Sequence, residues 1–432
     1  MSEAEALVRA ACSSDPRPAV ALLAARGAIS RHDIAAGCAA GDVESVAAAL
    51  TSDLRAAREP VPPFGWEPIL YATFSRLPRA DPGRAEGVRR VVGLLLDAGA
   101  DPNASFHNED WLQVPLYGAA GILNDAQLTA TLIAAGADPN DNETRAVGEA
   151  LYHGCEFPDP ACAAQLIDAG TDRKAVRYCL GRALNFPYPE MAEMFCAHGT
   201  RATAGHLLQA VWRRRPARTV RALLDSGAPV DGREKGEPDG PPALVVATRW
   251  GEAEVVELLR ERGADAAAAS DADRALGAYV AGGDSSPPRA DVQTLDAMLL
   301  MAVEQGDTAA AGRLMDAGAH ADGIPGGEEV PIGHATWRGY PDLVSLLVER
   351  GAALEFADGG SAMGAALHGS QHCNHPEGGP TMQTVGEIPQ APYGAILRTL
   401  LQAGARVPSR LGWEGAPPPQ AMVDELLRGG GT

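Results

Sequence analysis

Aliphatic and small residues recur along this chain in a phrase that ends at a glycine. Each copy carries a leucine-rich run, one or more polar or small positions, and then Gly followed by a small residue. The clear copies are LLLDAGADPN (94–103), TLIAAGADPN (131–140), QLIDAGTD (165–172), ALLDSGAPV (222–230), ELLRERGAD (257–265), RLMDAGAH (313–320), SLLVERGA (345–352) and TLLQAGA (399–405). Such self-similarity predicts an array of repeated units rather than one compact core.

The glycine of each copy stands where a helix is expected to end. A left-handed residue commonly closes a helix, and Gly adopts that conformation at the lowest cost. The predicted helix ends are Gly99, Gly136, Gly170, Gly227, Gly263, Gly318, Gly351 and Gly404, with weaker copies at Gly199 and Gly27. From Gly99 onward most intervals are 28 to 37 residues, and two intervals of 55 and 53 residues must hold insertions.

A second phrase precedes these glycines and predicts helix starts. It reads EPILYA (67–72), VPLYGAA (114–120), PALVVAT (242–248) and VPIGHAT (330–336), with degenerate forms elsewhere. Proline in the first turn of a helix loses no hydrogen bond, and the small alanine that follows lets neighbouring helices approach closely. Two helices per unit are therefore expected.

These two phrases resemble the ankyrin repeat, whose consensus is Thr-Pro-Leu-His-x-Ala at the first helix and Leu-Leu-x-x-Gly-Ala-Asp at the end of the second. The segment VPIGHATWRGYPDLVSLLVERGA (330–352) matches one unit nearly from end to end, and the stretch 65–103 looks like the opening of bacterial multi-ankyrin proteins. The consensus histidine is missing throughout. The resemblance implies an all-α ankyrin solenoid of about nine to ten helix-turn-helix units with helical caps.

The repeat pattern predicts five segments. Residues 1–63 form an N-terminal helical cap or degenerate repeats, and residues 64–268 form the first block of repeats. Residues 269–297 hold a degenerate helix and a linker insertion. Residues 298–405 form further repeats with a loop insertion at 369–392, and residues 406–432 close the C-terminal end.

The net charge of −20 makes some classes of binding partner less favourable than others. Nucleic acids and acidic membranes need positive charge, so neither is expected. The N-terminus has no basic and apolar leader and no apolar run is long enough to span a membrane, so a cytoplasmic protein is expected. Seven scattered cysteines predict free thiols. The negative charge leaves open an immunity or antitoxin role against a basic toxin.

Rings and arginines recur just after the alanine of the helix-start phrase, where ankyrin proteins line their concave face. Aromatic residues and Arg are enriched in binding surfaces. The predicted ligand-binding or partner-binding residues are Tyr71, Tyr117, Tyr152, His153, Trp212, Arg213, Arg249, Trp250, Trp337 and Arg338. Phe74 and Phe186, at the same slots, are expected in the core instead. The favoured function is non-catalytic recognition of a protein or peptide.

A histidine cluster supports an alternative function. His368, His372, Cys373 and His375 fall within eight residues and are of the types that bind zinc or another transition metal. A solvated loop explains the same residues without metal. No catalytic motif was found, and no cofactor is required. If the chain is a small-molecule or metal-dependent enzyme, its site is expected near His334, His368 and Glu377 at the C-terminal concave face.

Overall fold

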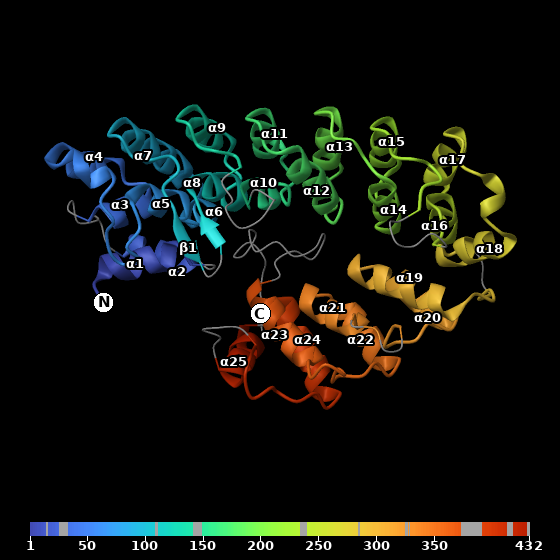
Figure 1. The fold of residues 1–432 in the computed structure, drawn as a ribbon. Coiled ribbons are helices and arrows are strands. Elements are labelled where there is room, and N and C mark those ends of the chain that lie inside the picture. Colours follow the sequence, from blue (N-terminus) through green and yellow to red (C-terminus); the bar gives the residue numbers. More distant parts are fainter. Residues whose placement is uncertain are drawn as a thin grey trace. The chain divides into compact units, whose positions relative to one another are not determined.

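The computed structural model describes residues 1–13, 16–25, 33–108, 111–140, 149–233, 240–283, 286–324, 327, 329–372, 391–412 and 418–429. The described chain is mostly helical (Figure 1), which confirms the all-α prediction. Its one sheet in these ranges is a hairpin of β1 (Phe106–Asn108) and β2 (Trp111–Gln113), which was not predicted. Phe106 of β1 stacks on Trp66 with ring centroids 4.0 Å apart.

The chain divides into two compact units. Unit 1 comprises residues 1–183 and 190–200, and unit 2 comprises residues 184–189 and 201–432. The repeat pattern did not predict a division at this point, because the glycine phrases continue through it at regular intervals.

Unit 1 is built from short helices in two rows (Figure 1). One row holds α3 (Ile34–Ala40), α5 (Pro68–Thr73), α8 (Pro115–Tyr117), α10 (Glu149–Gly154) and α12 (Arg173–Ala183). The other row holds α4 (Val43–Ser52), α7 (Ala85–Asp97), α9 (Ala126–Ala134), α11 (Ala161–Asp168) and α13 (Pro189–Ala197). The N-terminal end carries α1 (Glu3–Ala11) and α2 (Arg17–Ala24), and α6 (Leu77–Ala80) follows α5. Single turns lie at Leu54–Ala57 and Pro82–Arg84, and a π-helical turn, Gly118–Ile122, continues α8.

Unit 2 repeats the same helix pairs. They are α14 (Ala204–Trp212) with α15 (Ala217–Asp225), α16 (Ala243–Trp250) with α17 (Ala253–Glu261), α19 (Val292–Glu304) with α20 (Thr308–Asp316), α21 (Pro331–Arg338) with α22 (Pro341–Glu349), and α23 (Ala362–His372) with α24 (Ala391–Gln402). A turn at Ala266–Ala268 precedes α18 (Asp271–Val280), and α25 (Pro419–Gly429) packs on α23 and α24. The first helices contact one another in the order α14–α16–α18 and α19–α21–α23.

The predicted helix ends are confirmed wherever they are described. All nine glycines have φ between +79° and +113°, in the left-handed region. They are Gly99, Gly136, Gly170, Gly199, Gly227, Gly263, Gly318, Gly351 and Gly404. Gly27 lies outside the described residues. The helix starts are confirmed too, because Pro68, Pro115 and Pro331 open α5, α8 and α21, and Pro242 is the N-cap of α16.

Within each unit, the first helices of neighbouring repeats approach so closely that some positions tolerate no side chain. A Cβ on Gly277 of α18 would overlap the carbonyl oxygen of Thr248 in α16. In the same way, a Cβ on Gly369 of α23 would overlap the Trp337 carbonyl of α21. In unit 1, a Cβ on Gly118 would lie 2.5 Å from the Thr73 carbonyl oxygen.

Gly277→Ala is expected to lower the free energy of unfolding by about 1–3 kcal/mol, because the added methyl group must push α18 away from α16. Chemical denaturation measures the loss. Gly312→Ala is the matched control, because a Cβ there meets only Leu346 at 3.8 Å, an ordinary contact. Equal stabilities of the two variants would contradict the close packing described for α16 and α18.

Gly263→Val tests the helix end itself. Nothing lies within 4 Å of a Cβ built at Gly263, so the cost comes from the backbone angle of φ +88° and not from a clash. We expect a loss of roughly 1–3 kcal/mol for the β-branched residue and a smaller loss for Gly263→Asn, which tolerates the left-handed region better. A melting temperature of Gly263→Val equal to that of the wild type would refute this assignment.

Candidate functional site

The predicted ladder of rings does not form one exposed surface. Tyr71 is fully buried, its hydroxyl donates a hydrogen bond to the Val61 carbonyl at 2.6 Å, and it accepts one from the Phe64 amide at 3.0 Å. The prediction that Tyr71 contacts a partner is therefore wrong. Its ring and hydroxyl hold the loop before α5 in place.

In unit 1 the other three predicted residues do come together. The ring centroid of His153 lies 5.3 Å from that of Tyr117 and 4.9 Å from that of Tyr152, and the Arg182 guanidinium lies over Tyr152 at 4.8 Å. These rings are half-buried. His153 also lies between two carboxylates, 3.3 Å from Glu149 and 3.4 Å from Glu156.

The charge of His153 is stabilised within this cluster. Burial by itself lowers its pKa, but Tyr117 and the carboxylates of Glu149 and Glu156 outweigh burial and raise the pKa to about 10. Arg182 donates from Nε to Glu156 at 2.9 Å, so Glu156 balances two cations. The cluster is thus an internal network of charges and rings that joins α10 to α12.

Burial also corrects the prediction for Trp250. Its side chain is 1% exposed, and the Arg214 guanidinium covers its ring at 5.3 Å. Because α16 is packed between α14 and α18, the predicted slot faces the interior at this unit. Phe74 and Phe186 are buried as well, which confirms the prediction that both belong to the core.

The arginines beside Trp212 and Trp250 form ion pairs within unit 2. Arg213 pairs with the buried Glu304 at 2.9 Å, and Arg249 pairs with Asp273 of α18 at 2.7 Å. Trp212 is half-buried, and its carbonyl accepts a hydrogen bond from Gln305 at 3.1 Å. Neighbouring helices thus already supply carboxylates to Arg213 and Arg249, and the contact of these arginines with a partner stays a prediction.

The predicted residues of α21 and α23 line a hollow at the surface. His334, Trp337, Arg338 and His368 line it together with residues that the pattern did not identify, and its volume is about 380 Å³. The additional lining residues are Glu329, Val330, Gly333, Phe356, Asp358 and Ala365. We call this space the α21 hollow. The Arg338 guanidinium lies 5.8 Å from the centre of the Trp337 ring.

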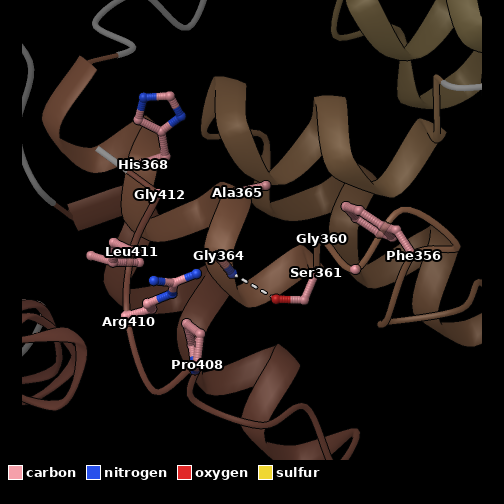
Figure 2. A pocket seen from close by; sticks show the side chains of 11 residues that line it. Phe356, Gly360, Ser361, Gly364, Ala365, His368, Pro408, Arg410, Leu411 and Gly412 are labelled. Atoms are coloured by element: carbon pink, nitrogen blue, oxygen red, sulfur yellow. Dashed lines mark hydrogen bonds between the residues drawn. The ribbon is translucent and has the colours of Figure 1, made fainter. Parts of the chain in front are cut away.

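A larger pocket of about 670 Å³ adjoins the α21 hollow and shares Phe356, Ala365 and His368 with it. We call it the α23 pocket. Figure 2 shows it between the first turns of α23 and the segment that follows α24. The remaining lining residues are Gly359, Gly360, Ser361, Gly364, Pro408, Arg410, Leu411 and Gly412.

Phe356 and Arg410 are functional candidates that sequence reasoning missed. Phe356 belongs to FADGGS (356–361), a glycine-rich turn directly before the start of α23, and this turn was the available signal. Arg410 follows the last helix-ending glycine, Gly404, where no repeat phrase marks any position.

Three side chains at the edge of the α21 hollow have metal-ligand types. Ligand atoms of Glu304, Glu329 and His334 lie within 4.8 Å of one another. The two carboxylates face opposite nitrogens of the ring, however, with Glu304 at 3.6 Å from Nδ1 and Glu329 at 3.8 Å from Nε2. Since Arg213 already pairs with Glu304, that carboxylate is less available to a metal ion. Burial is the main cause that lowers the pKa of His334, against the carboxylate of Glu304.

The predicted histidine metal cluster falls largely on residues without a description. Cys373, His375 and Glu377 lie outside the described residues, and His372 is described only as the last residue of α23. The side chain of His368 is exposed, although partial desolvation by its neighbours lowers its pKa.

The His153 cluster predicts a pH dependence of stability. Because its folded pKa of about 10 exceeds the ordinary 6.5, protonated His153 stabilises the fold fully below 6.5, and this contribution is lost as the pH rises through 10. The difference in unfolding free energy between the wild type and His153→Gln should therefore shrink across this range in urea titrations. A difference that grows with pH would contradict the network.

No helix in the described ranges has the length and hydrophobicity that a membrane crossing requires. No protein-family model matches the chain, and no curated protein matches it in sequence.

Proposed function

We propose that this chain is a non-catalytic recognition protein of the ankyrin-repeat type, which binds a protein or peptide on the exposed face of α21 and α23. The glycine helix ends, the proline helix starts and the stacked helix pairs support the ankyrin-type architecture. Fold alone does not establish function, so the proposal depends on the surface.

The observation that carries the proposal is the pair of adjoining pockets on α21 and α23. Both open to solvent and share one wall, so together they suit an extended ligand better than an enclosed substrate. Trp337 and Arg338 supply the residue types that dominate binding energies in protein interfaces. Within the described residues Arg338 makes no ion pair, in contrast to Arg213 and Arg249.

A metal-dependent enzyme is the second candidate, since Glu304, Glu329 and His334 converge at the same hollow. The arginine pairing of Glu304 and the open form of both pockets favour recognition. Elemental analysis of the purified chain separates the two functions, because a stoichiometric transition metal that is lost in His334→Gln would support the enzyme.

The recognition proposal predicts a loss of peptide capture in a Trp337→Ala, Arg338→Gln double variant. Affinity selection from a synthetic random-peptide pool should enrich a sequence motif with the wild-type chain. We expect the double variant to bind the enriched peptides at least about 10-fold more weakly, because hot-spot side chains contribute 2 kcal/mol or more.

Tyr178→Ala is the matched control for this experiment. Tyr178 is an aromatic residue of unit 1 that is 57% exposed and lines neither pocket, so its removal should leave the affinity unchanged. A double variant that keeps its melting temperature and binds the motif as tightly as the wild type would rule out this surface.

A further inference from the structure

We propose that the α23 pocket binds a carboxylate of the recognised peptide. This inference rests on the proposed function and names the chemistry of the ligand. The carboxylate belongs to the peptide's C-terminus or to an Asp or Glu side chain, and the two sources share the same interaction with the pocket.

The charges that line the α23 pocket support an anion. Arg410 and His368 are its titratable lining residues, and no carboxylate lines it among the described residues. The chain as a whole has 56 acidic and 36 basic residues, so a pocket lined by Arg and His without an acid departs from the average surface. Arginine is suited to carboxylates because its planar guanidinium donates two parallel hydrogen bonds.

The position of Arg410 suits this role. In Figure 2 its guanidinium points across the pocket toward Ser361 and Gly364 at the start of α23. Within the described residues Arg410 makes no ion pair, whereas Arg350 pairs with Asp316 at 2.8 Å and Arg262 pairs with Asp225 at 2.6 Å.

The glycines of the pocket provide room but few donors. A Cβ on Gly359 or Gly412 would meet nothing within 4 Å, so the floor is open there. The amides of Gly360 and Gly364 already donate to Asp358 at 2.8 Å and to Ser361 at 3.1 Å. Arg410, which makes no ion pair within the described residues, is consequently the charged side chain that would donate to the ligand.

The wall that the two pockets share indicates where the rest of the peptide would lie. Phe356, Ala365 and His368 line both pockets, so a peptide anchored at Arg410 continues over Phe356 toward Trp337. Volumes of about 670 and 380 Å³ fall within the range of ordinary ligand sites. An aromatic or aliphatic residue next to the carboxylate would then contact the Phe356 and Trp337 rings.

The test uses the full chain and two random-peptide pools that differ only in whether the C-terminus is free or amidated. Enrichment from the free pool alone assigns the carboxylate to the C-terminus, and enrichment of Asp or Glu in both pools assigns it to a side chain. Arg410→Gln should weaken binding of the enriched peptides by roughly 10-fold or more, as expected for a lost hydrogen bond to a charged group.

Arg406→Gln is the matched control, because Arg406 is an exposed arginine of the same segment that lines neither pocket. It should bind within about 2-fold of the wild type, the change expected for a screened surface charge. Peptides that depend on Trp337 but show no carboxylate preference, or that bind Arg410→Gln normally, would overturn this inference and leave the recognition proposal intact.

A second probe keeps the inference testable if no peptide is enriched and the recognition proposal fails. N-acetylphenylalanine carries an aromatic ring and a carboxylate, and its amide differs only in charge. Ligand-observed NMR should detect binding of the acid and not of the amide, and Arg410→Gln should abolish it. Equal signals from the two compounds, or none from the acid, would overturn the carboxylate site.

Discussion

Neighbouring first helices of the repeats approach one another through their backbones. Gly277 under the Thr248 carbonyl and Gly369 under the Trp337 carbonyl leave no space for a side chain, so the distance between these helices is set by the main chain. The threonines at such contacts donate inward, as Thr248 does to Leu244 at 2.7 Å and Thr336 does to Ile332 at 2.8 Å. These bonds satisfy the buried hydroxyls within their own helices.

The same constraint shapes the candidate site. At α21 the Trp337 carbonyl lies against Gly369 and also accepts a hydrogen bond from the Tyr393 hydroxyl at 2.8 Å. The backbone that carries Trp337 and Arg338 is therefore held from two sides, by α23 and by α24. A rigid backbone reduces the entropy that a binding surface loses when it meets its ligand.

The repeats of unit 2 differ in whether their arginines are paired with carboxylates of the same chain. Arg214 adopts φ +53°, a left-handed conformation that is costly for a non-glycine residue, and pairs with Glu252 at 2.7 Å and Asp307 at 2.6 Å. Together with the Arg213–Glu304 pair, these contacts connect the α14 end of unit 2 to α19 and α20. At α21, Arg338 is equivalent to Arg213 and makes no ion pair among the described residues, and it lines the α21 hollow.

The sequence by itself determined the helical class, the nine glycine helix ends and the proline helix starts, because each of these depends on local backbone preferences. It also identified Trp337, Arg338, His334 and His368 as site residues that lie together. It could not determine which rings are buried: Trp250 and Trp337 both follow the alanine of a helix-start phrase, yet Trp250 is buried and Trp337 lines a pocket. Burial of a ring depends on groups outside its own helix. The loop around Val61 covers Tyr71, and the guanidinium of Arg214 covers Trp250. Arg410 and Phe356 meet at the α23 pocket only through tertiary packing, since 53 residues separate them and no local pattern relates the two.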